Sequence, residues 1–345
     1  MDRSPPPRVH RPQRAIRLRS RLLVGVFFAL LAASSAAQEG RVLKLGVRAD
    51  APPFSSKIGE NMYDGYTVEL CRLIANEAII QRQFDQFKMI EVTALNRFQK
   101  LRDGEVDMLC GASTVTLERM RVANFTLMTF LSGASVIYNK AAVEEAGDNK
   151  NCSLTIGVLG NTTTQEKINR VVGEIQGDLG DDSPRCSVGP TVTISNHDDA
   201  IEQLLNGCIN AYIADREILL ALRQRARVKA AKALQPKIKE LDVSPNYLTF
   251  EPYAIGINIE QRELWLLANK VLSKLFDWRK GVSGNTIATV LRRYFPRKKF
   301  SKDLEYMFRL QQIERGKRVP DLPSSVGEPN KCSANSLPQS PVNHQ

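Results

Sequence analysis

A loop of small hydroxyl side chains that ends in an arginine, GASTVTLER from Gly111 to Arg119, has the clearest chemical potential in the sequence. It follows an apolar run typical of a buried strand, and a helix is predicted before that run, from Arg97 to Arg102. Small residues let a ligand approach the backbone, and a guanidinium offers a planar fork that matches a carboxylate. The loop therefore predicts a site for a small carboxylate, with a capped helix and a surface arginine as the alternative.

The same stretch resembles the amino-acid-binding motif of family 3 periplasmic solute-binding proteins of ABC importers. In that family the arginine that follows the glutamate grips the α-carboxylate of the ligand, which implies this role for Arg119. The neighbouring Asn96–Arg97 and Cys110–Gly111 pairs are most similar to the glutamate/aspartate-binding branch. The matching positions are Leu101, Gly104, Val106, Asp107, Thr114, Thr116, Glu118, Arg119 and Phe125.

Strand-like and helical segments alternate along the chain, which predicts an α/β protein with two lobes joined by two crossing strands. The resemblance implies the two-lobed type II fold of periplasmic binding proteins. Lobe 1 is expected to contain residues 38–138 and 252–312, and lobe 2 residues 139–251. The crossing strands are predicted at Ala134–Tyr138 and Glu251–Ile259.

The two ends of the chain differ from the rest in composition. Residues 1–37 join a basic segment to the twelve-residue apolar run Leu22–Ala33, which is too short to span a bilayer. This pattern predicts a signal peptide cleaved near Ala37 and a periplasmic location, with an uncleaved membrane anchor as the alternative. Pro, Ser and Asn dominate from Pro320 onward, so residues 313–345 are expected to be disordered.

The formal net charge of +11 is concentrated in two segments. Seven arginines fall within residues 1–37, and Arg279 to Arg318 contains twelve Lys or Arg residues against three acidic ones. Neither segment has the interleaved aromatic residues or zinc-ligand spacing typical of nucleic-acid-binding proteins. A solvated basic surface is therefore expected instead of a nucleic-acid interface. No cofactor motif is present, and we expect a monomer without a cofactor.

The residues predicted to surround a ligand fall near the carboxyl ends of predicted strands, where ligands bind in open α/β sheets. Arg48 ends the first strand, and Asp215 ends a strand in the second half of the chain. Ala94 and Ala112 stand where the glutamate/aspartate branch has serines, and Asn161 stands where glycine is usual. The full predicted set is Arg48, Phe54, Arg97, Ala112, Thr114, Arg119, Thr162, Thr163, His197 and Asp215.

The resemblance implies a role for each of the remaining residues in this set. Phe54 would lie over the bound amino acid, with burial in the core as the alternative. Thr162 and Thr163 match a hydroxyl-rich turn before a helix, where the free N–H groups form an anion site. Asp215 would pair with the ligand ammonium, with capping of the next helix as the alternative.

Two arginines and a histidine are implied to surround a second carboxylate, on the ligand side chain. They are Arg48, Arg97 and His197. The alternative for each arginine is a surface charge outside the site, and the alternative for His197 is an ordinary loop residue. The resemblance thus implies L-glutamate or L-aspartate as the ligand, with asparagine or glutamine tolerated. The implied mechanism is hinge closure around the amino acid, followed by delivery to a membrane ABC permease. The rival functions are a dehydratase acting on arogenate or prephenate and a sensory ligand-binding domain.

Six cysteines are too few for a disulfide scaffold in 345 residues, and none forms a CxxC motif. Two pairs are considered, Cys71 with Cys110 and Cys152 with Cys186. Cys208 competes for Cys152, so the pairing stays open.

Overall fold

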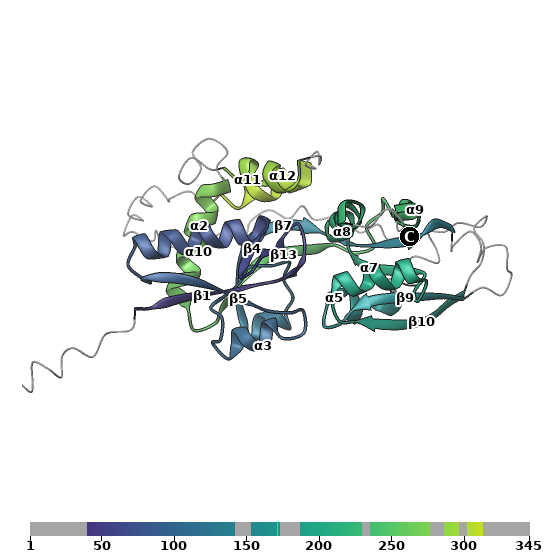
Figure 1. Cartoon of the computed structure of the whole chain (residues 1–345). Coiled ribbons are helices and arrows are strands. Elements are labelled where there is room, and N and C mark those ends of the chain that lie inside the picture. Colours follow the sequence, from purple (N-terminus) through teal and green to yellow (C-terminus); the bar gives the residue numbers. More distant parts are fainter. Residues whose placement is uncertain are drawn as a thin grey trace, which may run out of the picture.

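The structure is a computed structural model that describes residues 40–141, 153–170, 172, 187–229, 235–276, 286–296 and 302–312. Within these ranges the chain forms two α/β lobes that lie side by side (Figure 1). The two-lobed type II fold is thereby confirmed. The predicted signal peptide, the predicted tail at 313–345, Cys152 and Cys186 lie outside the described residues.

Lobe 1 is built on a five-stranded sheet of β1 (Val42–Val47), β5 (Gln86–Glu91), β6 (Met108–Leu109), β7 (Ala123–Ser132) and β13 (Glu251–Asn258). The strand order is β5-β1-β6-β13-β7. β1 pairs in parallel with β5 and β6, whereas β13 is antiparallel to β6 and β7. A small antiparallel sheet follows β1, formed by β2 (Asp50–Ala51), β3 (Ser55–Gly59) and β4 (Met62–Asp64).

Apolar residues at helical spacing hold the helices of lobe 1 on this sheet. The helices are α2 (Tyr66–Ile80), α3 (Arg97–Arg102), α10 (Arg262–Phe276), α11 (Ile287–Tyr294) and α12 (Lys302–Leu310). α2 and α10 lie on one side of the sheet and α3 on the other (Figure 1). The buried positions of α10 recur every three or four residues, which aligns them on one face: Leu264, Leu267, Ala268, Val271, Leu272 and Leu275.

Lobe 2 contains a second five-stranded sheet of β8 (Ala134–Asn139), β9 (Ser153–Leu159), β10 (Ser187–Ile194), β11 (Ala211–Asp215) and β12 (Leu241–Val243). The order is β10-β9-β11-β8-β12. β9 is parallel to β10 and β11, and β8 is antiparallel to β11 and β12. The helices of this lobe are α5 (Thr163–Glu166), α7 (His197–Asn206), α8 (Arg216–Lys229) and α9 (Gln235–Lys239).

The chain crosses between the lobes twice, at Gly133 and again just before β13. The backbone N–H of Ala134 donates to the Thr249 hydroxyl at 2.9 Å, and the N–H of Leu248 donates to the Ala134 carbonyl at 2.7 Å. The first crossing therefore falls between β7 and β8, and β8 belongs to the sheet of lobe 2. The predicted boundary at residue 138 lies within β8, which pairs with β11 and β12 of lobe 2.

Replacing Gly133 by Ala is expected to disturb this crossing. A methyl group there would lie 2.0 Å from the Thr249 carbonyl oxygen, so one backbone segment must move. We expect a loss of about 1–3 kcal/mol of stability, typical of overpacking, measured by denaturant unfolding. Gly256→Ala in β13 is the control, because its nearest contact would be an ordinary 3.5 Å. Equal stability of Gly133→Ala and wild type would contradict the close crossing.

A disulfide joins Cys71 on α2 to Cys110 at the end of β6. It is one of the two pairs considered from the sequence, and it ties a helix to the strand that precedes the predicted binding loop. Cys208 is exposed and forms no disulfide with any described residue. No helix in the described ranges is both long and apolar enough to cross a bilayer.

Candidate amino-acid-binding site

A pocket between the two lobes brings nearly all of the predicted site residues together. Its empty volume, counted to its open mouth, is about 390 Å³. Nine of the ten predicted residues line it, and the tenth, Phe54, does not. Five lining residues were not predicted, and all come from lobe 2: Leu159, Thr164, Ile213, Ala214 and Ile218. Each lies within three residues of Thr162, Thr163 or Asp215, so the stretches around the predicted residues could have indicated them.

Phe54 is a correction to the sequence-based expectation, because it is fully buried in the core of lobe 1. Its ring centroid lies 5.1 Å from those of Phe130 and Tyr253, in edge-on geometry. Tyr66 and Phe295 pack around it at 6.2 and 5.8 Å. Such aromatic clusters bury much apolar surface, so the ring is stabilised by the core and not available to cover a ligand.

Arg119 lies at the start of the 3-10 helix η1 (Arg119–Arg121), at the end of the hydroxyl-rich loop. Its side chain is buried, and its Nη1 donates to the Thr114 carbonyl at 3.0 Å. Its guanidinium lies 4.9 Å from the ring centroid of Phe98. Burial lowers the pKa of Arg119, with carboxylates that include Asp215 acting in the opposite direction. The arginine is therefore preorganised, and part of its donor fork remains available for an anion.

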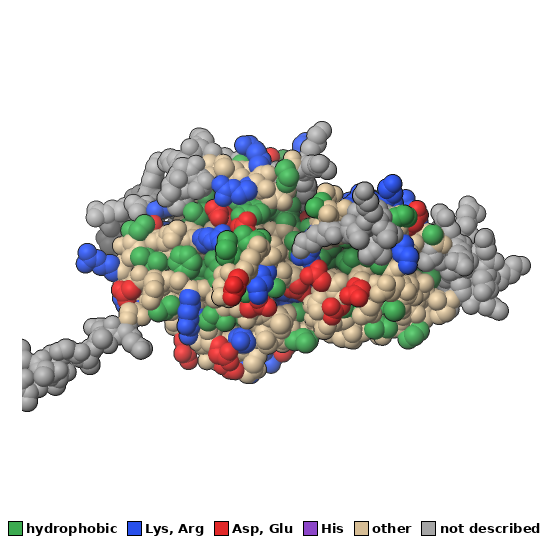
Figure 2. Space-filling model, in the orientation of Figure 1, with side chains coloured by type: hydrophobic (Ala, Val, Ile, Leu, Met, Phe, Trp, Pro, Cys, Tyr) green, Lys and Arg blue, Asp and Glu red, His purple; other side chains and the backbone are tan. Residues whose placement is uncertain are grey.

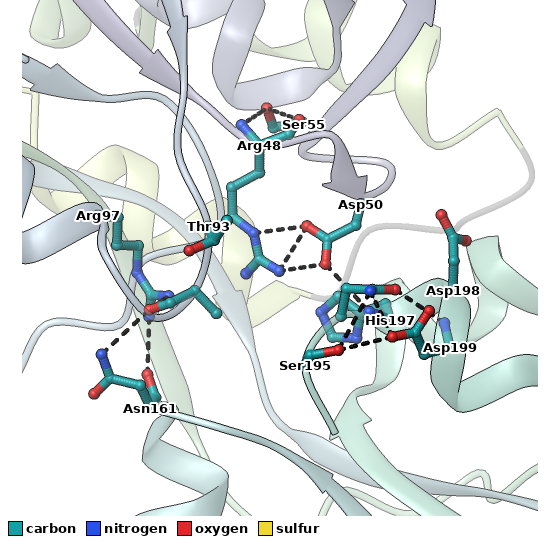
Figure 3. A network of polar contacts seen from close by, with 12 residues as sticks. Arg48, Asp50, Ser55, Thr93, Arg97, Asn161, Ser195, His197, Asp198 and Asp199 are labelled. Carbon is teal, nitrogen blue, oxygen red and sulfur yellow. Dashed lines mark hydrogen bonds and ion pairs between the residues drawn. The ribbon is translucent and has the colours of Figure 1, made fainter. Parts of the chain in front are cut away.

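Arg97 starts α3 and points into the same pocket (Figure 3). Its Nη1 donates to the Ala94 carbonyl at 2.7 Å, and its Nη2 lies 3.5 Å from the Asn161 carbonyl of lobe 2. Its Nε is buried without a hydrogen-bond partner among the described residues. Burial lowers the pKa of Arg97, and the charges of Arg48 and Arg119 lower it further. No carboxylate forms an ion pair with it in the described part of the chain, and the charge of Asp50, which acts to raise its pKa, does so without direct contact.

Arg48 is also buried, but it already has a carboxylate partner (Figure 3). Its Nε and Nη2 donate to Oδ1 and Oδ2 of Asp50 at 2.9 and 2.7 Å. Ser55 fixes the Arg48 backbone by bonding both its N–H and its carbonyl. Burial acts to raise the pKa of Asp50, but Arg48 and His197 outweigh it and hold that pKa below its usual value. Asp50 was not predicted, because the pattern around the PPF turn carries no sign of this pair.

His197, at the start of α7, is a neutral residue in this site. Its Nδ1 lies 2.7 Å from the Tyr212 hydroxyl, and the ring is buried. Burial, with Arg48 adding to it, lowers the pKa of His197 to about 3. The imidazole therefore stays uncharged above about pH 4 and can offer a ligand only a neutral hydrogen bond.

Asp215 ends β11 directly before α8, at the position of a helix cap, and it also lines the pocket. Its Oδ1 is buried and lacks a partner within the described ranges. Burial raises the pKa of Asp215 to about 7; the Tyr253 hydroxyl opposes this rise, and Glu251 and Glu217 add to it. A buried carboxylate of this kind is stabilised by any cation that enters the pocket.

Glu251 is a second carboxylate near the pocket and is fully buried, where β13 begins next to the crossing. It accepts from the hydroxyls of Thr163 at 2.8 Å and Thr249 at 2.9 Å, and Lys167 lies 3.6 Å away. Thr163 in turn lies 3.5 Å from Thr114, oxygen to oxygen, across the two lobes. Glu251 was not predicted, because its sequence context reads as an ordinary strand end.

The predicted turn at Asn161–Thr163 has the expected conformation but leads to a shorter helix. Asn161 has a φ of 55°, in the left-handed region where glycine or asparagine is favoured. Thr162 caps α5 by accepting from the Gln165 N–H, and this helix is a single turn. Thr162 and Thr163 line the pocket, so the anion site expected from the free N–H groups of this turn remains a prediction, beside the arginines.

Residues 43–224 match the bacterial extracellular solute-binding proteins, family 3. The chain belongs to this family. It is 25% identical over 246 residues to the ABC transporter glutamine-binding protein GlnH of Bacillus subtilis (strain 168), covering 70% of this chain and 78% of that protein. It is 24% identical over 190 residues to the glutamate/aspartate import solute-binding protein of Escherichia coli (strain K12), covering 54% and 59%. The chain is thus an amino-acid-binding protein of the ABC importer class.

Solved structures show the same fold at low sequence identity. An ancestral arginine-binding protein bound to glutamine gives a TM-score of 0.56 at 18% identity, covering 74% of this chain and 97% of that one. The ancestral amino-acid-binding protein AncCDT-1, a precursor of cyclohexadienyl dehydratase, gives 0.53 at 19% identity, covering 74% and 95%. At these identities the likeness shows the fold alone.

Proposed function

We propose that this family 3 protein acts in the periplasm, where it captures L-glutamate or L-aspartate between its lobes and delivers it to an ABC permease. Arg119 would hold the α-carboxylate, and Asp215 the ammonium. Arg97 would take the carboxylate of the side chain. Each lobe supplies part of this set, so a bound amino acid stabilises the closed arrangement over the open one.

The lack of an ion-pair partner for Arg97 among the described residues is the observation that carries the acidic ligand. Once an amino acid pairs with Arg119 and Asp215, Arg97 is the guanidinium that still lacks an anion. Its Nε already lacks a partner among the residues described, and the side chain is 4% exposed. A buried cation without a counter-ion costs several kcal/mol, which a side-chain carboxylate would offset.

Replacing Arg97 by Gln is expected to lower the affinity for glutamate by roughly 100-fold, since it removes one partner of a buried charge pair. The affinity for glutamine should change much less, because its amide does not depend on a full positive charge. Isothermal titration calorimetry with both ligands measures the ratio of the glutamate affinity to the glutamine affinity. Arg102→Gln on the same helix is the control, because that side chain is 55% exposed and does not line the pocket. An unchanged ratio in Arg97→Gln would contradict the assignment.

Glutamine is the second candidate ligand, and the Arg48–Asp50 pair favours it. Asp50 already neutralises the charge of Arg48. The pocket therefore contains one fewer arginine that needs a carboxylate from the ligand. A tighter fit of glutamine than of glutamate to the wild-type protein in the same titrations would select this candidate.

A dehydratase-like enzyme is the alternative from another class, and the raised pKa of Asp215 favours it. A carboxyl group that titrates near pH 7 is suited to general acid–base catalysis. Incubation with arogenate or prephenate, followed by detection of the aromatic product, tests this directly. Turnover by the wild-type protein that is lost in Asp215→Asn would establish the dehydratase activity.

A further inference from the structure

Asp50 does not itself line the pocket, but it lies between Arg48 and His197 and links the two lobes (Figure 3). It belongs to β2 of lobe 1, and it holds Arg48 with two hydrogen bonds in a fork-to-fork arrangement. Its Oδ2 also accepts a hydrogen bond of 3.1 Å from the backbone N–H of His197 in lobe 2. A single carboxylate thus connects an arginine of one lobe to the other lobe.

The lobe 2 partner is the first residue of α7, a ten-residue helix. The first N–H groups of a helix have no partner inside the helix, and a negative charge is favourable there. Asn196 caps the same helix by accepting from the Asp199 N–H at 2.9 Å. Asp50 satisfies the His197 N–H from across the cleft, so this helix end is completed only when the lobes are together.

Asn161 makes a second set of contacts between the lobes, next to Arg97. Its side-chain amide donates to the Leu95 carbonyl at 2.9 Å and to the Ala94 carbonyl at 3.3 Å. All these bonds, like those of Asp50, join atoms of the protein itself. They therefore favour the closed arrangement independently of any contact that a ligand makes.

The pairing also separates the roles of two arginines that are otherwise alike. Arg48 is 3% exposed and engaged by a carboxylate at two atoms. Arg97 is 4% exposed, and its partners among the described residues are neutral: two carbonyls and the Phe98 ring, 5.0 Å from the guanidinium. A second carboxylate brought in by a ligand must compete with Asp50 for Arg48, but has no such rival at Arg97.

We propose that Asp50 is a positioning residue that binds Arg48 and, with it, holds the lobes together. Recognition of the ligand side chain then depends on Arg97. Arg48 and Asp50 form an internal latch against the N-terminus of α7. The latch raises the fraction of closed protein without ligand, and apparent affinity scales with that fraction. The selectivity part of this inference rests on the proposed function, whereas the latch does not.

Small-angle X-ray scattering of the ligand-free mature protein tests the latch without any amino acid. Asp50→Asn and Arg48→Gln should each increase the radius of gyration, and the double variant should increase it no further because the two residues act as one unit. Asp198→Asn is the matched control. It removes a carboxylate from the first turn of α7, next to His197, but the ion pair of Asp198 with Arg225 lies within lobe 2 and does not join the lobes. Circular dichroism checks that each variant is folded. An unchanged radius of gyration in both Asp50→Asn and Arg48→Gln would overturn the latch.

Titration with glutamate and glutamine then tests the division of roles. Arg48→Gln should lower both affinities by the same factor, within about twofold, since only the closed fraction changes. Arg97→Gln should change the glutamate-to-glutamine ratio by at least tenfold. A selective loss of glutamate in Arg48→Gln would overturn the division. If no amino acid binds the wild-type protein, the proposed function fails, but the scattering result still decides the latch.

Discussion

Replacing Arg119 by Gln is expected to abolish measurable binding of every amino acid, whatever its side chain. Arg119 is the only arginine of the hydroxyl-rich loop, it is 8% exposed, and it is fixed by Phe98 and the Thr114 carbonyl. Truncating one partner of a buried, hydrogen-bonded charge pair costs about 3–5 kcal/mol, or a loss of 100-fold or more. Calorimetric titration with the preferred ligand measures this.

The control for Arg119 is Arg121→Gln, two residues further along the same 3-10 helix. Arg121 is exposed and does not line the pocket, so its replacement should leave the affinity unchanged. A loss in Arg119→Gln that is confined to acidic amino acids would show that this arginine binds the side chain and not the shared α-carboxylate. The assignment of Arg97 would then be wrong as well.

The second large effect is a dependence of affinity on pH that comes from Asp215. The pKa of this carboxyl is raised to about 7, and only its ionised form attracts an ammonium. The ionised fraction falls as the pH falls, so binding is strong above pH 7 and weakens below it. The expected loss is about tenfold between pH 8 and pH 6. At pH 7, ligand binding should also release about half a proton, because the ammonium lowers the pKa of Asp215.

Two variants separate Asp215 from His197 as the source of this dependence. His197 has a pKa lowered to about 3, so it does not titrate in this range, and His197→Asn should keep the pH profile. Asp215→Asn should bind weakly and without the pH dependence. A flat profile in the wild type, or one that disappears in His197→Asn, would contradict this account of the site.

Much of the site could be predicted because its residues lie in short motifs that resemble those of the family. The hydroxyl-rich loop places Thr114 and Arg119 five residues apart, and both line the pocket. The role of Asp215 was implied by the resemblance, and the residue stands at the end of a strand, as expected. Each of these motifs is contained within one loop or strand end, so a short stretch of sequence is enough to recognise it.

The parts that were missed depend on contacts between distant segments. Asp50 acquires its role from the N–H of His197, 147 residues away in the other lobe. Phe54 sits in a turn where an aromatic ring suits either a cleft or a core, and only the rings of Phe130 and Tyr253 decide between them. The lobe boundary depends on the approach of Gly133 to Thr249, which no local pattern reveals.

Lysine and arginine side chains are scattered among acidic ones on the face shown in Figure 2, and they do not form one continuous basic patch there. No group of three or more His, Cys, Asp or Glu side chains in the described part of the chain is arranged to hold a metal ion. We expect recognition in this protein to depend on Arg97, Arg119 and Asp215 of the pocket.

A thermal-shift panel of the twenty amino acids on the mature protein tests the central claim most directly. A ligand that binds only the native state raises the melting temperature by mass action. The charges of Arg97, Arg119 and Asp215 predict that glutamate and aspartate give the largest shifts, with smaller ones for glutamine and asparagine. A largest shift from a cationic or an apolar amino acid would contradict the assignment of Arg97 and with it the proposed ligand.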